Sequence, residues 1–574
     1  MVTRRFLATI ALVVVAAMSH VLAGGGQFGP PPKLYTPEPG AKDLKAVLFN
    51  WTWHMGMLRG VSEPEIVSTL EYQGNGTIQV DGQPCTLTKY RVSTNYQTPG
   101  QRTQITCTRA NGQTYSAIEV VSGEYAWNED IPGAEIIPGK GKAAPAPAAL
   151  QERLIRLWAS PQGAPKAAIA GAAGLPLSET FAKNPATLLD ARPAGGPSLT
   201  TLSWDAGKAV VTFPIPGVVG ATATATLDSA FLPERVVVKH GSVTTEFVYG
   251  KYDDWNNPLN KIEALYAGTI VERRNGVAAR TLTTVETETG SVYVVMPVPA
   301  GVRAASKVAA QPPSAPSGPQ AAAAAAQTPR LSDGKPDLTG SWQSAPFALP
   351  YGFRRCSPWQ VECVQWTNQT EDFELEAPSR LGPNRPLYKP EHWDKVIELD
   401  MWTNREDPVM TCQPLGIPRQ GPPNRVFHTA QDITLLYRGG IDGGGGYAEY
   451  RVIPTDGRKH DPERAKEYTY NGYTIGHWEG DTLVLDSIGF TDATWLARGG
   501  FFHTDEMRVV EKFTRQGNEI RYEVTVEDPQ VLVEPWVMTP RVLRLGTNPN
   551  AGLLPERGNC DELEKGEVAN QIRH

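Results

Sequence analysis

The sequence predicts a mainly β protein, with two β-rich domains joined by a flexible Ala/Pro-rich linker. Short segments of alternating apolar and polar residues recur along the chain, turn residues separate them, and one internal stretch has a composition that cannot form a core. The chain has 49 prolines and 55 glycines, a content that suits strands and turns better than long helices. Its 574 residues also exceed what one hydrophobic core usually serves.

The N-terminal residues 1–23 have the pattern of a signal peptide. Arg4 and Arg5 give a positive start, and the apolar run Phe6–Ala17 is too short to span a bilayer comfortably. A retained N-terminal anchor is the alternative. No later apolar stretch has the length of a membrane span, so we expect a periplasmic or secreted protein with no stable membrane span after signal cleavage.

The acidic balance of the chain excludes one class of partner. The formal net charge is -7, whereas nucleic-acid binding needs a basic face that displaces counterions. We therefore expect no nucleic-acid partner.

Residues 304–330 are the clearest boundary in the chain. They contain a Pro-rich stretch followed by the alanine run Ala321–Ala326. This stretch is predicted to be a linker between an N-terminal domain over 35–303 and a C-terminal domain over 331–574.

The N-terminal region alternates as a sheet does, with one helix. A hairpin is expected at Gly74-Asn75-Gly76, between strands Ser68–Tyr72 and Thr77–Val80. A helix is expected over Ala148–Trp158, where apolar residues share one face. The other expected strands are Thr88–Ser93, Gln104–Thr108, Lys208–Phe213, Thr222–Leu227, Arg235–Lys239, Thr244–Tyr249, Thr281–Thr287 and Ser291–Met296.

Two segments of this region carry a family resemblance. Leu232–Val238 reads Leu-Pro-Glu-Arg-Val-Val-Val, and Phe247–Tyr252 reads Phe-Val-Tyr-Gly-Lys-Tyr. With the preceding helix they resemble the periplasmic lipoprotein-sorting (LolA-like) half-barrels. The resemblance implies a curved antiparallel sheet whose concave face carries apolar or acyl material.

The C-terminal region begins irregularly and continues as hairpins. The last hairpin contains Glu519–Glu527, whose alternation predicts a strand with one wet face. We expect a β-barrel or strongly curved sheet. Its expected strands are Asp432–Tyr437, Tyr447–Ile453, Tyr473–Glu479, Thr482–Ser487, Met507–Thr514, Glu519–Glu527, Val531–Val537 and Arg541–Leu545.

Specific strings in the C-terminal region also carry a resemblance. Pro336–Trp342 reads Pro-Asp-Leu-Thr-Gly-Ser-Trp, and Gly476–Asp486 reads Gly-His-Trp-Glu-Gly-Asp-Thr-Leu-Val-Leu-Asp. These strings resemble a large group of exported bacterial proteins, many of them acidobacterial, for which no activity is established. The resemblance therefore implies a relative and no reaction.

Gly340-Ser341-Trp342 resembles the opening of a lipocalin barrel. There the tryptophan packs under an arginine from the last strand, a role that Arg541 or Arg544 is expected to fill. The resemblance implies a lipocalin-like cup for a small lipophilic ligand, which we expect Trp342, His477 and Trp495 to line. An ordinary buried tryptophan at the start of a strand is the alternative.

Histidines with nearby acids suggest a catalytic alternative. His503 follows a glycine-containing loop and precedes Glu506, and His428 lies earlier in the chain. As candidate catalytic residues, one histidine would act as base, Glu506 or Asp492 would orient it, and Arg498 would stabilise negative charge. The spacing matches no metal motif, and no cofactor motif is visible, so we expect neither a metal nor a cofactor.

The six cysteines are an even number in a chain expected to leave the cytosol, so disulfides are the default expectation. Cys85 and Cys107 lie beside neighbouring strands. The expected pairs are Cys85 with Cys107, Cys356 with Cys363, and Cys412 with Cys560.

Three functions stay open from the sequence. The first is an exported protein that binds or carries a small lipophilic or aromatic ligand. The second is a cofactor-independent hydrolase or lyase with a His/acid site in the C-terminal domain. The third is a scaffolding protein with a protein partner in the envelope.

Overall fold

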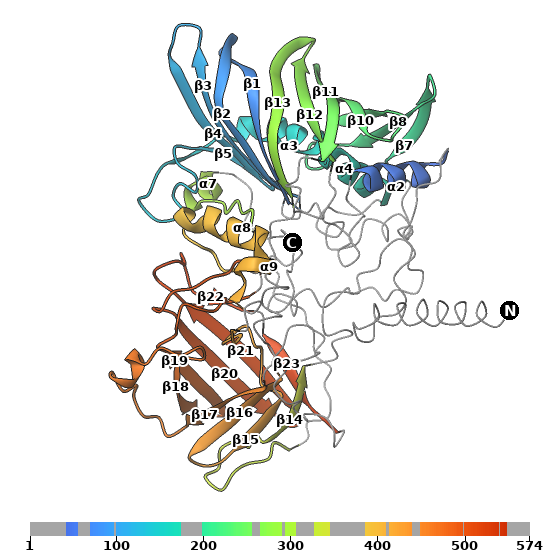
Figure 1. Ribbon diagram of the computed structural model, residues 1–574. Coiled ribbons are helices and arrows are strands. Elements are labelled where there is room, and N and C mark those ends of the chain that lie inside the picture. The colour runs from blue at the N-terminus through green and yellow to red at the C-terminus, as the bar shows by residue number, and fades with distance from the viewer. Residues whose placement is uncertain are drawn as a thin grey trace, which may run out of the picture.

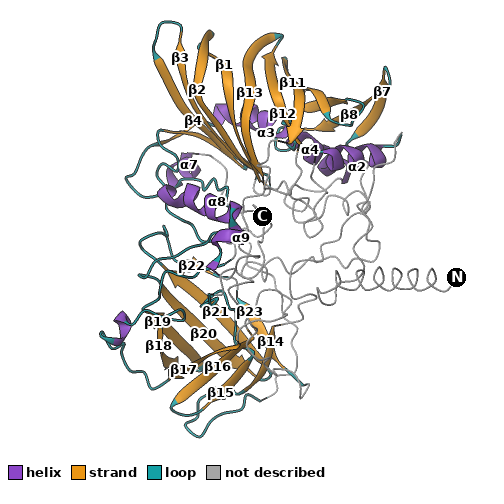
Figure 2. Cartoon of the chain, in the orientation of Figure 1, coloured by secondary structure: helices purple, strands orange, loops and turns teal. Residues whose placement is uncertain are grey.

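The computed structural model describes residues 42–55, 69–96, 99–173, 198–254, 265–289, 293–305, 327–344, 385–408, 413–438, 448–497, 499–538 and 540–547. Over these residues the protein is mainly β, as the sequence predicts (Figure 1, Figure 2). One large antiparallel sheet lies in the N-terminal half, and a barrel-like sheet lies in the C-terminal half. The expected signal peptide lies outside the described residues.

The N-terminal sheet has 13 strands in an uninterrupted antiparallel order. Its strands are β1 (Thr69–Val80), β2 (Gln83–Asn95), β3 (Gly100–Arg109), β4 (Thr114–Ser122), β5 (Tyr125–Glu129), β6 (Ala143–Pro145), β7 (Thr201–Asp205), β8 (Lys208–Pro214), β9 (Thr222–Leu227), β10 (Pro233–His240), β11 (Val243–Asp254), β12 (Leu265–Arg274) and β13 (Val277–Thr289). Strands β1 to β6 follow one another from the middle of the sheet to one edge, and strands β7 to β13 follow one another from the opposite edge to the middle. The first and last strands therefore meet in the middle, where β1 pairs with β13.

The expected hairpin at Gly74-Asn75-Gly76 is wrong. Strand β1 runs straight through these residues, and its pairing with β13 shifts register between Gln73 and Gly74. Gly76 has a φ of 138°, and a Cβ atom there would lie 2.0 Å from the carbonyl oxygen of Thr281. The glycines therefore permit a β-bulge and a close approach of two strands, and do not form a turn.

The expected strand Ser291–Met296 is also not formed over its described residues. Residues 293–299 run as irregular chain, and Val294 and Val295 use their carbonyl groups to accept hydrogen bonds from Asn95 and Arg102. These bonds replace the strand ladder that the alternation suggested.

Three helices lie against the inner face of the N-terminal sheet: α2 (Leu44–His54), α3 (Leu150–Trp158) and α4 (Gly163–Ala173) (Figure 1). The short 3-10 helix Pro147–Ala149 precedes α3, so the predicted helix is confirmed with a slightly later start. Trp51 of α2 and Trp158 of α3 are completely buried, and the ring centroid of Trp51 lies 6.3 Å from that of Phe213 on β8. The helices therefore share one core with the concave side of the sheet.

The C-terminal sheet has 10 strands and is nearly closed. Seven of the strands that build it match expected segments closely, whereas the expected strand Val531–Val537 is reduced to Trp536–Val537. The strands are β14 (Gly340–Ser344), β15 (Arg425–His428), β16 (Asp432–Arg438), β17 (Ala448–Pro454), β18 (Tyr473–Glu479), β19 (Thr482–Ile488), β20 (Arg508–Gln516), β21 (Glu519–Glu527), β22 (Trp536–Val537) and β23 (Arg541–Leu545).

The two ends of this sheet, β17 and β18, approach each other without forming a ladder. The amide of Gly457 donates a hydrogen bond to the carbonyl oxygen of Gly476, 3.0 Å away. Side chains close the remaining seam: Arg451 of β17 reaches Thr474 of β18 and Glu511 of β20. A buried polar cluster thus completes the barrel.

The remaining helices lie between the two sheets (Figure 1). They are α7 (Ala300–Ala305), the 3-10 helix Pro390–His392, α8 (Trp393–Met401) and α9 (Thr403–Glu406), while the 3-10 helix Arg464–Lys466 lies in the barrel region. The guanidinium of Arg102, on β3, lies 4.8 Å from the centroid of the Trp393 ring, on α8. The hydroxyl of Tyr293 donates to the carbonyl oxygen of Pro386 and accepts from the amide of Tyr388. The two halves therefore touch through buried groups.

The expected disulfide between Cys85 and Cys107 is confirmed, and it joins β2 to β3. The other four cysteines, Cys356, Cys363, Cys412 and Cys560, lie outside the described residues. Among the helices that the structure describes, none has the length and apolar character of a membrane span.

Candidate functional site

The structure buries His503 beside Trp495, next to the start of β20. Its side chain is 3% exposed, its Nε2 atom lies 2.7 Å from the hydroxyl of Thr494, and its Nδ1 atom lies 2.9 Å from the carbonyl oxygen of Thr504. Both ring nitrogens therefore have local partners. Burial lowers the pKa of His503 below its ordinary value of 6.5.

The acids proposed to orient His503 make no hydrogen bond to its ring, whose partners are Thr494 and Thr504. Asp492 and Glu506 are exposed, and the backbone amide of Glu506 donates to the hydroxyl of Thr504. Arg498 lies outside the described residues. The side chain of His503 thus has a hydroxyl and a carbonyl as neighbours, an arrangement typical of a satisfied core histidine.

His428 is buried at the end of β15, 8% exposed. Its Nδ1 atom accepts a hydrogen bond from the amide of Leu338, 3.3 Å away, and its ring lies 5.7 Å from that of Trp478. The proton of the neutral ring therefore sits on Nε2. Burial lowers the pKa of His428, and this effect exceeds the opposite one of the nearest carboxylates.

His477 is exposed on β18, and its Nε2 atom lies 3.4 Å from Glu479, which also pairs with Lys512. It lies beside the turn between β18 and β19. His503 lies at the opposite end of the same strands, next to where β19 ends and β20 begins. A seven-residue strand spans about 20 Å, so the described residues bring His477 and His428 to one end of the barrel and His503 to the other.

Trp342 is 2% exposed and lies at the start of the barrel, where its indole N–H donates to the carbonyl oxygen of Leu338. The cation above its ring is Arg515 of β20, 5.0 Å from the ring centroid. The expectation that Arg541 or Arg544 packs over Trp342 is wrong, because the arginine over the ring comes from β20. Arg544 pairs with Glu519 instead. An arginine thus packs over Trp342, as the lipocalin resemblance implies, but it comes from β20 and not from the last strand.

No group of three or more potential metal ligands occurs in the part of the chain that the structure describes. The catalytic candidates that the structure describes are dispersed: His428 and His503 lie at opposite ends of the barrel. Asp492 and Glu506 are exposed on its surface.

The buried histidines predict a particular pH dependence of stability. Folding lowers the pKa of His428 and of His503, so the unfolded chain takes up protons at a higher pH than the folded chain. Their contribution is complete above the unfolded value of 6.5 and is lost as the pH falls toward the folded pKa. We expect the double variant His428→Gln/His503→Gln to lose less stability than the native protein between about pH 7.5 and pH 5.5, measured by urea unfolding.

His477→Gln, which changes an exposed imidazole, is the matched control and should keep the native pH dependence. An unchanged slope in the double variant would show that the two buried rings do not carry the effect.

A cavity that no sequence pattern predicts lies on the concave side of the N-terminal sheet. It lies under the end of α3, over the central strands β1, β2, β11, β12 and β13, and has a volume of about 30 Å³. Six of its lining residues are aromatic: Tyr72, Tyr90, Tyr96, Phe247, Tyr249 and Tyr266. A volume of this size holds a single water molecule, so the aromatic surfaces are almost in contact with the helix.

Tyrosine hydroxyls form a polar line along this cavity. The ring centroid of Tyr72 lies 6.0 Å from that of Tyr90 and 5.1 Å from that of Tyr266. Burial raises the pKa of Tyr72 and of Tyr266 well above the ordinary value. These groups therefore stay neutral and can each donate or accept a hydrogen bond.

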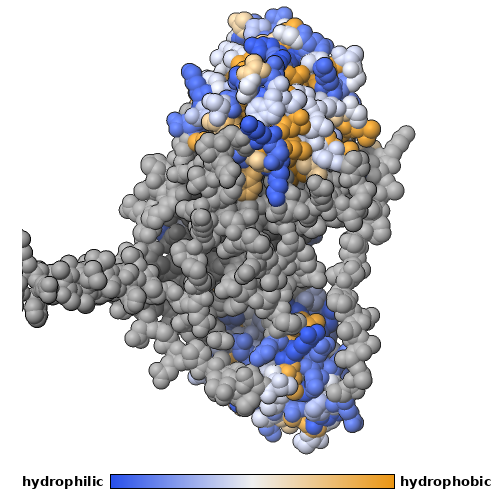
Figure 3. Space-filling view, turned by 90° about the vertical axis from the view of Figure 1, so that its right-hand side faces the viewer, coloured by the Kyte–Doolittle hydropathy of each residue, from blue (hydrophilic) through white to orange (hydrophobic). Residues whose placement is uncertain are grey.

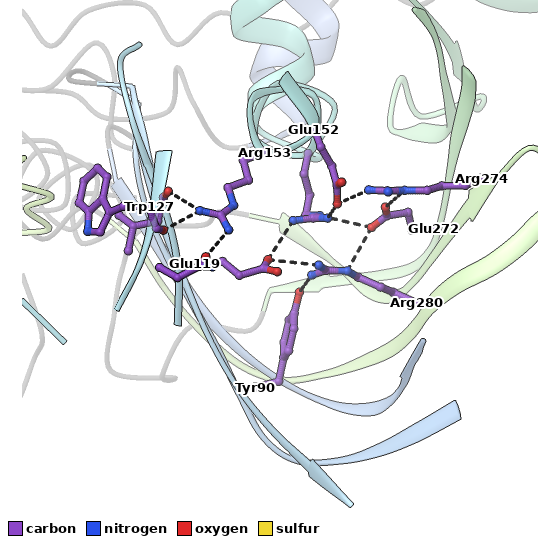
Figure 4. Close-up of polar contacts among 11 residues, drawn as sticks. Tyr90, Glu119, Trp127, Glu152, Arg153, Glu272, Arg274 and Arg280 are labelled. Atoms are coloured by element: carbon purple, nitrogen blue, oxygen red, sulfur yellow. Dashed lines mark hydrogen bonds and ion pairs between the residues drawn. The ribbon is translucent and has the colours of Figure 1, made fainter. Parts of the chain in front are cut away.

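Charged residues line part of the cavity, among them Arg156, Glu272 and Arg280, and Figure 4 shows the network of polar contacts to which they belong. Arg280 of β13 donates to the hydroxyl of Tyr90, 2.8 Å away, and pairs with Glu119 and Glu272, each at 3.4 Å. Arg156 of α3 pairs with the same two glutamates, at 3.3 and 3.4 Å. Helix α3 is therefore fixed to three strands of the sheet by shared carboxylates.

Two more arginines complete this ionic cluster. Arg274 pairs with Glu152 and Glu272, and Arg153 donates to the carbonyl oxygens of Val120 and Trp127 (Figure 4). Burial by itself would raise the pKa of Glu272, but the neighbouring guanidiniums, led by that of Arg156, hold it below its usual value. The ionic cluster consists of Glu119, Glu152, Glu272, Arg153, Arg156, Arg274 and Arg280.

The sequence contained a weak signal for this cluster. In β12 the inward positions read Ile270 and Glu272, and in β13 they read Arg280, Leu282 and Thr284. A charged residue at an inward strand position is costly unless it is paired. Two such residues of opposite charge on adjacent strands therefore point to a buried pair, although their partners on α3 could not be identified without the fold.

A second cavity, of about 250 Å³, lies where α8 meets strands β1, β2 and β13. Its lining includes Arg91, which pairs with Glu71 and Asp394 at 3.0 and 2.9 Å. Its other charged lining residues are all acidic: Glu286, Glu288 and Glu398. This cavity belongs to the contact between the two halves of the chain.

No family model matches the chain, and no curated protein matches it either. A structure described as a putative outer membrane lipoprotein-sorting protein domain from Vibrio parahaemolyticus matches with 8% identity and a TM-score of 0.23, over 42% of this chain and 91% of that chain. A DUF1329 family protein from Desulfovibrio piger matches with 7% identity and a TM-score of 0.24, over 43% of this chain and 94% of that chain. Similarity at this level identifies no family, and the resemblance of the C-terminal region to a group of exported bacterial proteins stays a prediction.

Proposed function

We propose that this chain is an exported protein that binds or carries a small apolar or aromatic ligand on the concave face of its N-terminal sheet. The observation that carries the proposal is the aromatic cavity under α3. Six aromatic side chains, from four strands and the loop that follows β2, converge there on one water-sized space. Converging aromatic rings with a few placed polar groups are typical of small-molecule sites.

Export has two supports in the chain. Residues 1–23 have the pattern of a signal peptide. The disulfide between Cys85 and Cys107 is of the kind that persists in an oxidising compartment such as the periplasm.

Ligand entry requires the helices α2 to α4 to move from the sheet, because the cavity holds only about 30 Å³ in this form. Helix α4 consists mainly of small residues, and buried polar atoms at the helices favour such movement. The indole nitrogen of Trp51, the Oδ1 atom of Asn50 and the Oε1 atom of Gln162 have no hydrogen-bond partner in the described structure. Each costs about 1–3 kcal/mol, a penalty that an open form would relieve.

We further propose that the N-terminal half, 35–303, and the C-terminal half, 331–574, are two domains, with the ligand in the first. The face shown in Figure 3 has apolar residues scattered among polar ones on the described parts of both sheets. Such a face gives no support to a broad apolar scaffolding surface.

A neutral polarity-sensitive dye tests the proposal. The exported protein, purified without detergent, is expected to bind Nile red with a stoichiometry near one. Leu282→Phe should fill the cavity that Leu282 lines and weaken dye binding at least about tenfold, with an unchanged or higher Tm. The measurement is a fluorescence titration, together with native mass spectrometry for a retained apolar ligand.

Leu202→Phe, the same substitution on the edge strand β7, is the matched control and should bind dye as the native protein does. Equal dye binding by the Leu282 and Leu202 variants, or no stoichiometric binding by the native protein, would refute a site in this cavity.

A further inference from the structure

The charges around the aromatic cavity identify the polar part of its ligand. The ionic cluster contains four arginines and three glutamates, all within the described residues, so it carries one excess positive charge. Arg153 accounts for the excess, since its donors go to backbone carbonyls and to the amide oxygen of Asn128. A buried excess charge is costly unless a counter-charge offsets it.

Two arginines and a carboxylate that pairs with both of them touch the cavity. Arg156 and Arg280 line it, with side chains 11% and 10% exposed, and Glu272 lines it as well. The hydroxyl of Tyr90 accepts a hydrogen bond from Arg280 and lines the same space. Guanidinium and hydroxyl donors at one end of a water-poor pocket are suited to an anionic oxygen group, for which charge-assisted hydrogen bonds are strongest.

Apolar side chains line the sheet side of the cavity beyond the arginines. Ile270 and Leu282 lie opposite each other on β12 and β13, next to Glu272 and Arg280, and Leu70 lies farther along β1. Phe247 lies opposite Glu272, on the neighbouring strand β11. A ligand that reaches the arginines must therefore lay an apolar portion over these side chains.

We propose that the ligand is an anionic amphiphile of the carboxylate class, with its head group at Arg156 and Arg280 and its chain or ring over the aromatic floor. This inference rests on the proposed function and specifies the substrate class of the same site. When α3 moves outward, the ion pairs of Arg156 loosen. An anionic head group that binds there offsets the excess positive charge of the ionic cluster.

Two probes that differ only in charge test the assignment. Dansylaminoundecanoic acid should bind the native protein at least about tenfold more tightly than its methyl ester. Decanoate should displace the acid probe, whereas acetate at the same concentration should not. Displacement by acetate would indicate a site for a free anion and would overturn the amphiphile.

The variant Arg280→Met is expected to weaken binding of the acid about tenfold or more and to change binding of the ester by less than about threefold. Arg235→Met, which changes an exposed arginine on the same sheet, is the matched control and should affect neither probe. The acid-to-ester ratio of the native protein tests the assignment even if the Arg280 variant does not fold.

The outcomes separate the two proposals. Stoichiometric Nile red binding with equal affinity for acid and ester would overturn the anionic head group and leave the apolar site intact. Failure of all three probes to bind would overturn both.

Discussion

Replacing Arg451 by methionine is expected to lower the free energy of unfolding by about 3–5 kcal/mol. The guanidinium lies inside the C-terminal barrel, 5% exposed, and its Nη2 atom lies 2.5 Å from Glu511, which is completely buried. Without Arg451, the Glu511 carboxylate would stay buried with only the hydroxyl of Tyr522 as its described neutral donor. An uncompensated buried charge is among the most destabilising defects in a core.

The position of Arg451 adds to this effect. It is the side chain that crosses the seam between β17 and β18, where the barrel lacks a strand ladder. It also donates to the hydroxyl of Tyr437 at 2.6 Å, so three strands besides its own depend on it. Its loss should therefore open the seam as well as leave a charge unpaired.

Urea unfolding of Arg451→Met, of Arg451→Met/Glu511→Leu and of Arg544→Met provides the measurement. The double variant should recover most of the loss, because replacing both partners removes the buried charge. Arg544 has an exposed partner, Glu519, and its variant should lose far less. A double variant as unstable as the single one would show that seam contacts, and not the charge, dominate.

The strands of the barrel could be predicted because one face is wet and the other is buried. Glu519–Glu527 and Tyr473–Glu479 have the expected bounds in the structure. The alternation of these segments contains the information for a strand and for which side chains face inward. It contains none for the partner strand, which is why the closure over Trp342 was assigned to β23 and is made by Arg515 of β20.

The aromatic cavity and its ionic cluster could not be predicted for a different reason. The shared apolar face of helix 148–158 predicts which apolar side chains face the core, and it gives no information on Arg153 and Arg156. The concave sheet surrounds the helix, so Arg153 is buried along with Leu154 and Trp158. Residues 119, 152, 272 and 280 meet only through tertiary folding, and local pattern gives a weak signal for the pair Glu272 and Arg280 alone.

The histidine hypothesis failed to gain support for a related reason. Proximity in the sequence placed His503 beside Asp505 and Glu506, yet the turn that follows directs Glu506 to solvent and the ring to Thr494. Sequence neighbours in a turn point in different directions, so adjacency alone does not assemble a catalytic pair.

Replacing Trp393 by alanine is the second large effect, with an expected loss of about 3–5 kcal/mol. The ring is 7% exposed, its N–H donates to the carbonyl oxygen of Tyr388, and Arg102 of the N-terminal sheet lies over its face. A Cβ atom on Gly133 would lie 2.8 Å from this ring, so the two halves of the chain are in close contact there. Independent movement of two domains has to break this contact.

The consequence should appear in the shape of the unfolding curve as well as in its midpoint. In the native protein the contact couples the two cores, whereas in Trp393→Ala the N-terminal and C-terminal sheets should unfold in separate steps. Far-UV circular dichroism and tryptophan fluorescence, followed in urea, should therefore give coincident curves for the native protein and divergent curves for the variant. Trp393→Phe retains a ring under Arg102 and should lose less, and Trp204→Ala, at an exposed position on β7, should change little. If Trp393→Ala keeps coincident curves and native stability, then the ring does not couple the two sheets, and the linker alone connects two independent domains.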